Sequence, residues 1–220
     1  NIYVGGAFTS YNGNSSPYFA CISQTGTWNP AFVSQFDKEV RAIKLRSDGS
    51  IMLGGLFYGF GNYAIHGLAR IMQTGEIDTT FNRNTGGGIE ILGTQKFNNG
   101  DELVFGTMES FDGILVPSHV AKTDSTGNIY LDNFRTLPFE RVNDVVIDST
   151  NKVLIGGQLK TGTPLPFEPI IRTDEQGNID PGFNSGINFS NSLALVYDIK
   201  PLSGGSYIVL YQNGNNLFVT

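Results

Sequence analysis

The segment GEIDTTF, residues 75–81, sets two carboxylates beside a glycine and two threonine hydroxyls. Carboxylate oxygens are ligands that hard cations such as Ca²⁺ prefer. A carboxylate held in a cleft can instead act as a general acid or base. Aspartate close to a glycine is also typical of a tight turn, in which the side chain accepts backbone N–H bonds. Glu76 and Asp78 therefore have three interpretations: a cation site, a catalytic acid, or a turn.

The other residues that could do chemistry lack the partners that such chemistry needs. His66 and His119 are the only histidines, and neither has a second His or Cys at ligand spacing, which argues against a zinc or iron site. Cys21 lies in an apolar run, so we expect a buried, unreactive thiol. The sequence holds no G-x-S-x-G, H-E-x-x-H or G-x-x-x-x-G-K-[ST] motif. We therefore predict no catalytic, metal-binding or cofactor-binding residue.

Two glycine-containing segments resemble ligand loops only in part. TGGGIE, 85–90, has no lysine beside it and opens no helix, so a loop is favoured over a phosphate site. TDEQGNID, 173–180, spaces its acidic residues somewhat like a calcium loop. Counted from Asp174, however, its glycine is fourth and a serine is twelfth, where an EF-type loop has Gly at position 6 and Glu at position 12. An Asx-type turn is favoured, and a calcium-stabilised repeat protein stays open as an alternative.

The composition is that of a β-rich chain with little charge. Of 220 residues, 40% are apolar and 15% charged, and there are 28 glycines and 16 phenylalanines, a balance typical of short strands joined by tight turns. The net charge is −6 and no basic run occurs, which argues against nucleic-acid binding through phosphates. No apolar run approaches the roughly 18 residues of a spanning helix, so no membrane insertion is expected. The chain begins at Asn1 in a strand-like run, and we expect a segment of a longer protein.

Two motifs recur along the chain at the same intervals. The first is an apolar run ending in glycine: IYVGG at 2–6, IMLGG at 51–55, LVFGT at 103–107 and VLIGG at 153–157. The second is a glycine turn ending in phenylalanine: ISQTGTWNPAF at 22–32, IMQTGEIDTTF at 71–81, TDSTGNIYLDNF at 123–134 and TDEQGNIDPGF at 173–183. From the first glycine of each run (5, 54, 106, 156), and from each turn glycine (26, 75, 127, 177), the intervals are 49, 52 and 50 residues. Two motifs that share three intervals indicate an internal repeat.

A third, alternating stretch precedes the later apolar runs and ends in a turn: VRAIKLRSDG at 40–49, ILGTQKFNNG at 91–100, VNDVVIDSTN at 142–151 and VYDIKPLSGG at 196–205. We expect the glycine-ending runs to be inner strands buried on both faces, and the alternating stretches to be strands with one wetter face. SDGS, NNGD and STNK read as two-residue turns between adjacent strands.

Repeats of roughly 50 residues with several strands each predict an all-β protein, a β-propeller or open propeller arc of about four to five blades. The repeats form one domain over 1–220, with units at about 1–49, 50–100, 101–151 and 152–205 and a partial unit at 206–220. A β-solenoid or a row of hairpins is the alternative, disfavoured because solenoid coils are usually shorter than this repeat.

At this level the chain resembles the delta-60 repeat (DUF5122-type) β-propeller family. The resemblance is carried by GGAFTSYNG at 5–13, LARIMQTGEIDTTF at 68–81 and IIRTDEQGNIDPGF at 170–183. The first repeat departs from the family pattern at Trp28 and Asn29. The third departs most, because LVFGT lacks the second glycine and NIYLDNF has one extra residue. The resemblance implies a propeller in bacterial surface or secreted proteins and some phage virion proteins, and implies no particular reaction.

The loops that follow the glycine-ending runs differ between repeats while their flanks recur. They span 7–18, 56–66, 108–118 and 158–168. Variable loops of repeat proteins gather on one face, often the binding face. We therefore predict that a protein or glycan partner is contacted there by large aromatic anchors: Tyr11, Tyr18, Tyr58, Phe60, Tyr63 and Phe111. The alternative is that these rings pack between neighbouring blades.

These observations favour a non-enzymatic scaffold and an interaction or adhesion module of a larger extracellular assembly, on a virion (phage tail or fibre) or at the bacterial cell surface. A single cysteine is compatible with a virion or a large secreted β-protein, and equally with the cytosol. One alternative is a carbohydrate-active propeller enzyme, which needs a pair of carboxylates facing one channel. The acids weighed for it are Glu76, Asp78, Glu109, Asp112, Asp174 and Asp180.

The repeats decide how GEIDTTF is interpreted. Glu76 corresponds to Thr27 and to Asn178, so we expect it to face solvent. Asp78 corresponds to Asn29 and Asp180, which keeps a short polar acceptor but not a charge, so a turn is favoured and Asp78→Asn is expected to be nearly silent. Phe81 recurs in every copy, and we expect a buried ring.

Overall fold

The structure is a computed structural model that describes residues 1–81, 90–163, 168–189 and 194–220. Most of the glycine segment 85–90 and part of the fourth variable loop, 164–167, lie outside the described residues. The described chain is built from short antiparallel strands, with two 3₁₀ turns, η1 (Asn133–Thr136) and η2 (Ser203–Gly205). The predicted all-β class is confirmed.

The strands fall into successive sets along the sequence. The first set is β1 (Ile2–Gly5) and β4 (Phe19–Ile22), and the second is β5 (Val40–Leu45), β6 (Ile51–Gly55) and β9 (Leu68–Ile71). The third is β10 (Ile91–Lys96), β11 (Glu102–Gly106) and β14 (Val120–Thr123), and the fourth is β15 (Phe139–Ile147), β16 (Val153–Leu159) and β17 (Ile170–Thr173). The fifth is β18 (Leu195–Pro201), β19 (Tyr207–Asn213) and β20 (Asn216–Val219). Three hairpins are inserted: β2 (Ser10–Tyr11) with β3 (Asn14–Ser15), β7 (Gly59–Phe60) with β8 (Tyr63–Ala64), and β12 (Ser110–Phe111) with β13 (Ile114–Leu115).

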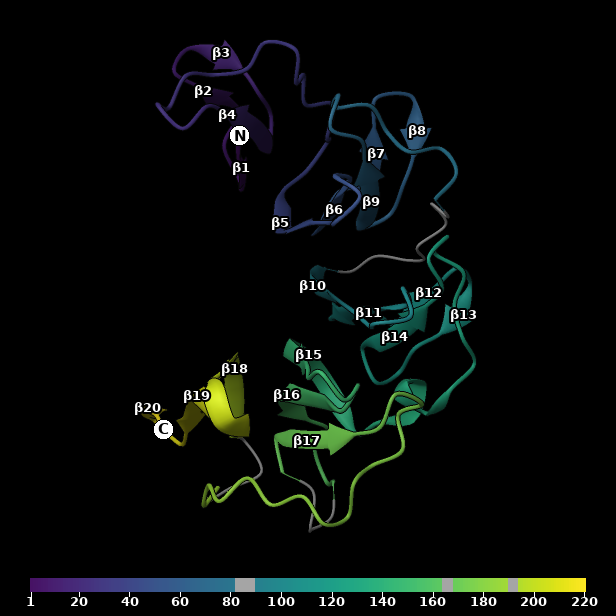
Figure 1. Ribbon diagram of the computed structural model, residues 1–220, viewed down its shortest axis with the longest axis vertical. Coiled ribbons are helices and arrows are strands. Elements are labelled where there is room, and N and C mark those ends of the chain that lie inside the picture. Colours follow the sequence, from purple (N-terminus) through teal and green to yellow (C-terminus); the bar gives the residue numbers. More distant parts are fainter. Residues whose placement is uncertain (82–89, 164–167, 190–193) are drawn as a thin grey trace.

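The sets follow one another around an arc that is open on one side (Figure 1). The strands β5, β10, β15 and β18 line the inner side of the arc, and consecutive ones contact each other. Among the described residues, one strand pair, Gln158 with Leu195, joins the fourth set to the fifth. The described strands thus form an open arc and not a closed ring, and the number of blades stays a prediction.

In the second to fourth sets the glycine-ending runs are the middle strands, not the inner ones, whereas β1 pairs with β4 alone and is partly exposed, against the prediction of a strand buried on both faces. Every residue of β6 and of β11 is buried, as predicted, because each strand pairs along both edges and is packed between neighbouring sets. The inner position belongs to the alternating strands such as β5, which are partly exposed because they border the open side of the arc.

The second glycine of each run allows a close backbone approach. A Cβ on Gly55 would overlap the carbonyl oxygen of Glu39, and one on Gly157 would overlap that of Arg141. Gly106 stands in the same relation to the carbonyl oxygen of Glu90. Gly106 is therefore equivalent to the second glycine, and the residue that LVFGT lacks is the first. Phe105 replaces it.

The turns between adjacent strands have three residues, not the two predicted. In the turn from β5 to β6, Arg46 N–H donates to the Ser50 carbonyl and Gly49 N–H donates to the Arg46 carbonyl, while Gly49 is left-handed at φ +83°. A type I turn followed by a left-handed residue gives this loop length. The same pattern closes the GEIDTTF turn, where Gly75 N–H donates to the Met72 carbonyl at φ +91°.

The phenylalanine that ends each turn motif is packed into the next set. Phe81 is 2% exposed and shares a core with Val104 and Ile129 of the third set. A Cβ added to Gly75 would come within 3.3 Å of the Phe32 ring, so the ring from the first repeat lies on the turn of the second. The predicted buried ring is confirmed, and Glu76 is exposed, as expected.

Candidate functional site

The variable loops hold the three inserted hairpins, which extend beyond the main strand sets. The β2–β3 tip is Asn12–Gly13 and the β12–β13 tip is Asp112–Gly113, all four with positive φ. Consecutive left-handed residues of the Asn-Gly and Asp-Gly kind form type I′ turns, which match the twist of a hairpin. The sequence placed these loops correctly but did not show that they pair into strands.

Two of the six predicted contact residues are buried, which corrects their assignment. Phe60 is 4% exposed, with its ring centroid 4.9 Å from that of Phe36. Phe111 is 1% exposed and packs with Met52 of the second set and Val104 of the third. These rings fill the core between neighbouring sets, as the alternative interpretation proposed, because the hairpin strand that carries each one folds back over that core.

Tyr11 and Tyr18 are half-buried and contact the rest of the first repeat. The Tyr11 hydroxyl donates to the Gly26 carbonyl at 2.9 Å, which links the first hairpin to the turn of its own repeat. Tyr18 has φ +65° and packs against the core around Phe19. Both residues are therefore suited to hold the loop in place more than to bind a partner.

Tyr58 and Tyr63 are the predicted residues that present their rings to solvent, and we call them the Tyr58–Tyr63 surface. They are 42% and 41% exposed. Tyr58 N–H donates to Asp37 Oδ1 at 2.9 Å, and Lys38 Nζ lies 4.6 Å from the Tyr58 ring centroid. The His66 ring meets Tyr58 edge-on with centroids 5.8 Å apart. Exposed rings held by such contacts lose little side-chain freedom when they bind a partner.

The candidate calcium loop is an Asx turn. Asp174 Oδ1 accepts the N–H groups of Gln176 and Asn178, and Asp174 Oδ2 accepts the Asn178 side-chain amide. Burial alone would raise the pKa of Asp174, but these hydrogen bonds outweigh it and lower the pKa. Across the described part of the chain, no group of three or more His, Cys, Asp or Glu side chains could hold a metal ion.

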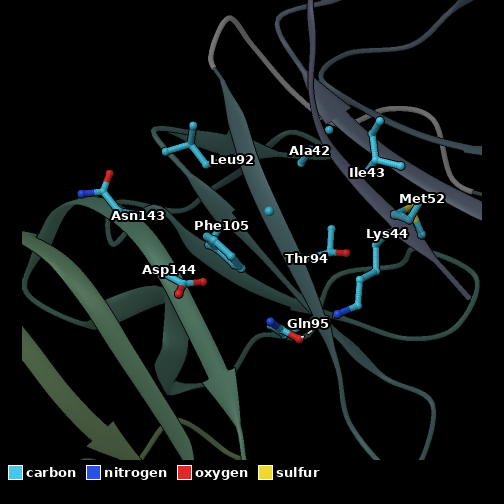
Figure 2. Close-up of a pocket in the computed structure, with 12 residues that line it drawn as sticks. Ala42, Ile43, Lys44, Met52, Leu92, Thr94, Gln95, Phe105, Asn143 and Asp144 are labelled. Carbon is cyan, nitrogen blue, oxygen red and sulfur yellow. Dashed lines mark hydrogen bonds between the residues drawn. The ribbon is translucent and has the colours of Figure 1, made fainter. Parts of the chain in front are cut away.

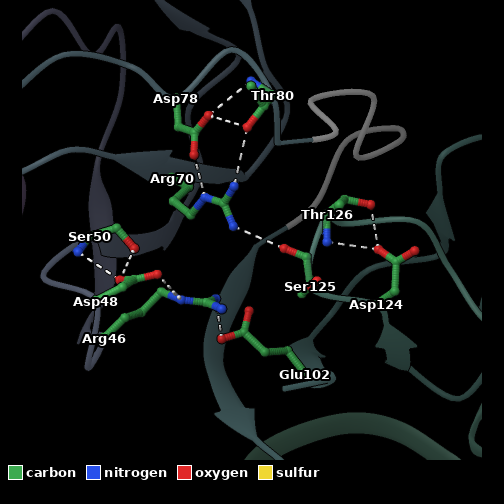
Figure 3. A network of polar contacts seen from close by, with 10 residues as sticks. All are labelled: Arg46, Asp48, Ser50, Arg70, Asp78, Thr80, Glu102, Asp124, Ser125 and Thr126. Carbon is green, nitrogen blue, oxygen red and sulfur yellow. Dashed lines mark hydrogen bonds and ion pairs between the residues drawn. The ribbon is translucent and has the colours of Figure 1, made fainter. Parts of the chain in front are cut away.

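Asp78 makes an ion pair that the sequence comparison missed. Arg70 Nε donates to Asp78 Oδ2 at 2.6 Å, and both side chains are largely buried (Figure 3). Asp78 Oδ1 also accepts the Thr80 N–H and hydroxyl. Burial raises the pKa of Asp78, but the Thr80 and Arg70 contacts together lower it below its usual value.

The residue that pairs with the Asp78 position differs between repeats. Arg172 pairs with Asp180 at 2.8 Å in the fourth repeat. In the first repeat the corresponding residues are Cys21 and Asn29, and the Asn29 amide points at the Cys21 sulfur, 3.8 Å away. The two repeats with aspartate at this position are thus the ones with arginine eight positions earlier, while the third repeat has Lys122 and Tyr130 there.

Asp78→Asn is therefore not expected to be silent. An amide that keeps the Thr80 bonds through its oxygen must turn its NH₂ toward Arg70, so donor meets donor. We expect a loss of about 1–2 kcal/mol in the free energy of unfolding at pH 7, measured by urea denaturation. Because the folded-state pKa is lowered, the difference should shrink as pH falls below about 4. Glu76→Gln, in the same turn and exposed, is the matched control and should be silent; equal losses in both variants would contradict the ion-pair account.

A groove of about 200 Å³ lies on the inner side of the arc and crosses β5, β10 and β15 (Figure 2). Polar groups from Lys44, Gln95 and Asp144 surround it, and the Phe105 ring forms part of its floor. Phe105 packs onto Gly93, where a Cβ would overlap the ring, so the lost glycine of LVFGT is compensated across the strand pair. Thr94 Oγ1 is buried in the wall without a hydrogen-bond partner.

Two inner-strand carboxylates that the sequence analysis did not consider come together beside this groove. β15 and β18 each have a bulge, between Val142 and Asp144 and between Val196 and Asp198. Bulges re-aim the side chains that follow them. Asp144 and Asp198 hold the same register position in VNDVVI and VYDIKP, which was the available signal, and burial, with the nearby Asp198 carboxyl adding to it, raises the pKa of Asp144 to about 6. By contrast, Asp78 and Asp180 each pair with an arginine of their own repeat.

An ion pair is buried between the second and third sets. Arg46 Nη1 lies 2.5 Å from Glu102 Oε1, and the two side chains are 3% and 2% exposed (Figure 3). Arg46 Nε is 3.9 Å from Asp48 Oδ2, at the turn that precedes β6. The pair connects a turn of one repeat to the first residue of β11 in the next.

Successive antiparallel sets on an arc, each packed on its neighbour, define a β-propeller type of repeat protein. Residues 1–32 and 46–81 match the family described as "Domain of unknown function (DUF5122) beta-propeller". This match is consistent with the resemblance to the delta-60 repeat family and covers about a third of the chain. The comparison with curated proteins found no match. Among the described residues, no helix has the length and apolar character needed to cross a membrane.

Proposed function

We propose that the chain is a non-enzymatic β-propeller scaffold that binds a partner through the Tyr58–Tyr63 surface. The observation that carries this proposal is the pair of half-exposed tyrosines on a hairpin whose other ring, Phe60, is fixed in the core. Tyrosines combine a large contact area with few rotatable bonds and are enriched among the residues that dominate binding energy. Lys38, Asp37 and His66 surround Tyr58 with polar groups suited to a glycan or a polar protein surface.

We further propose that this module works in a larger extracellular assembly, a phage tail or fibre or a bacterial surface protein. The family resemblance and the low charge support that setting. A rigid arc of packed sets suits a part that must hold a contact surface in place.

The described acids do not favour the carbohydrate-active enzyme. Glycosidases need two carboxyl groups roughly 5 Å apart or more that face one another, so that a sugar or water can lie between them. Asp78 and Asp180 each pair with an arginine of their own repeat, and Asp198 pairs with Lys200, so these carboxylates belong to separate ion pairs.

A panel of purified bacterial and animal surface glycans tests the proposal directly. The wild-type protein should bind at least one glycan without hydrolysing it. Tyr58→Ala and Tyr63→Ala should each weaken that binding by roughly tenfold or more. Tyr197→Ala is the matched control, because Tyr197 is 40% exposed but lies on β18 at the inner side of the arc, and it should bind normally. Full binding by a Tyr58→Ala/Tyr63→Ala double variant, or release of sugar products, would contradict the proposal.

A further inference from the structure

The third repeat buries a lysine against a carboxylate of the neighbouring strand. Lys122 lies on β14, and its Nζ is 3.3 Å from Oδ2 of Asp101, the residue that precedes β11. The two side chains are 10% and 14% exposed, so both charged groups are largely removed from water. Desolvating two charges is expensive, and their attraction repays that cost only in part. A reaction that removes both charges is therefore favoured here.

Several contacts hold the Lys122 nitrogen in place. It donates to the Glu175 carbonyl, in the turn of the fourth repeat, at 3.0 Å. It also lies 4.7 Å from the ring centroid of Phe97 and 5.3 Å from that of Tyr130. These contacts restrict a side chain that is otherwise long and flexible. Two groups that a protein holds together in this way react far faster than the same groups free in solution.

The Asp101 carboxyl is held from both of its oxygens. Oδ2 accepts the Asn99 side-chain amide at 2.9 Å, and Oδ1 accepts the Tyr130 hydroxyl at 3.3 Å. The Asp101 N–H donates in turn to Asn99 Oδ1 at 3.0 Å, which fixes the backbone of the turn. Such donors stabilise the negative charge that develops on a carboxyl oxygen when a nucleophile attacks the carbon.

The third repeat differs from the other three in combining a lysine with an aspartate at these positions. In the other repeats, the position of Lys122 is held by Cys21, Arg70 and Arg172, and that of Asp101 by Asn1, Ser50 and Lys152. Arginine stays protonated in proteins, whereas lysine can lose its proton and act as a nucleophile. The lysine therefore permits a reaction that the arginines of the second and fourth repeats cannot undergo.

We propose that Lys122 and Asp101 join in an amide bond, which cross-links β14 to the start of β11. One proton moves from the Lys122 ammonium to the Asp101 carboxylate, and the neutral amine attacks the carboxyl carbon. A C–N bond forms and a C–O bond breaks. The leaving hydroxyl takes a second proton from the nitrogen and departs as water, so no oxidant, reductant or other reactant is needed. The nitrogen keeps one hydrogen, which can still donate to the Glu175 carbonyl.

The mass of the intact protein tests this cross-link. The purified wild type should be lighter than its sequence by one water molecule. Trypsin should not cleave after Lys122, and tandem mass spectrometry should find a branched peptide joined through Lys122 and Asp101. Lys122→Arg, which keeps the charge found in the second and fourth repeats, and Asp101→Ala should each have the full mass. Lys44→Arg is the matched control, because Lys44 contacts the Gln95 amide oxygen, and it should keep the water loss.

The position of the water loss separates this bond from a competing reaction. An aspartate that precedes glycine, such as Asp112, can cyclise onto its own backbone and also release water, but Lys122 then stays open to trypsin. A wild type with its full sequence mass and ordinary cleavage after Lys122 would overturn the proposal, and that measurement needs no variant. So would a water loss that persists unchanged in Lys122→Arg or Asp101→Ala.

Discussion

Replacing Phe81 with alanine is expected to lower the free energy of unfolding by about 3–5 kcal/mol. The ring is 2% exposed and fills the core between the second and third sets, so its loss removes buried apolar surface and leaves a cavity that rigid strands close poorly. Urea denaturation followed by circular dichroism measures the change. Leu131→Ala is the control, since Leu131 belongs to the corresponding motif of the third repeat but is 72% exposed and should be nearly silent. Superimposable unfolding curves for the wild type and Phe81→Ala would contradict the stabilising role of the buried Phe81 ring.

Glu102→Ala alone is expected to lower the free energy of unfolding by about 3–5 kcal/mol, because it leaves the Arg46 guanidinium buried without its partner. The cost arises from the uncompensated charge more than from the loss of the pair, since burial alone already opposes ionisation and raises the pKa of Glu102.

A double variant separates these two origins. Arg46→Met/Glu102→Leu fills the space with apolar groups of similar size and should regain most of the stability lost in Glu102→Ala. If the double variant is as unstable as the single one, the specific geometry of the pair, and not the burial of a lone charge, accounts for the loss.

Most of the fold could be predicted from the repeat, because motifs that recur in the sequence form the same contacts in most copies. The places of the turns, the burial of Phe32, Phe81 and Phe134, and the burial of the glycine-ending strands β6 and β11 were predicted from three shared intervals, whereas β1 is partly exposed and Phe183 is half-buried. The position of those strands in the middle of each set was missed, since burial on both faces does not distinguish a middle strand from an inner one. Gly106 was misaligned because the change at Phe105 is compensated at Gly93, on another strand.

The site was less predictable, since it depends on contacts that differ between copies. Phe60 and Tyr63 belong to one hairpin, yet one ring is in the core and the other half-exposed, and only strand pairing decides which. Asp78 looked dispensable because Asn29 replaces it, but the accompanying change from Arg70 to Cys21 was not considered. Asp144 and Asp198 are far apart in sequence and meet only because consecutive inner strands touch.

The phenylalanine carried by one set and seated in the next has a mechanical consequence. The strand sets are connected in series, and one phenylalanine ring packs at each junction between neighbouring sets and resists its bending. Where the ring is enclosed, as at Phe81 and Phe134, bending must open a packed core. Phe183 is only half-buried, so the joint it serves is the softest by this measure. Elastic bending of the arc should therefore concentrate at the end of the fourth set.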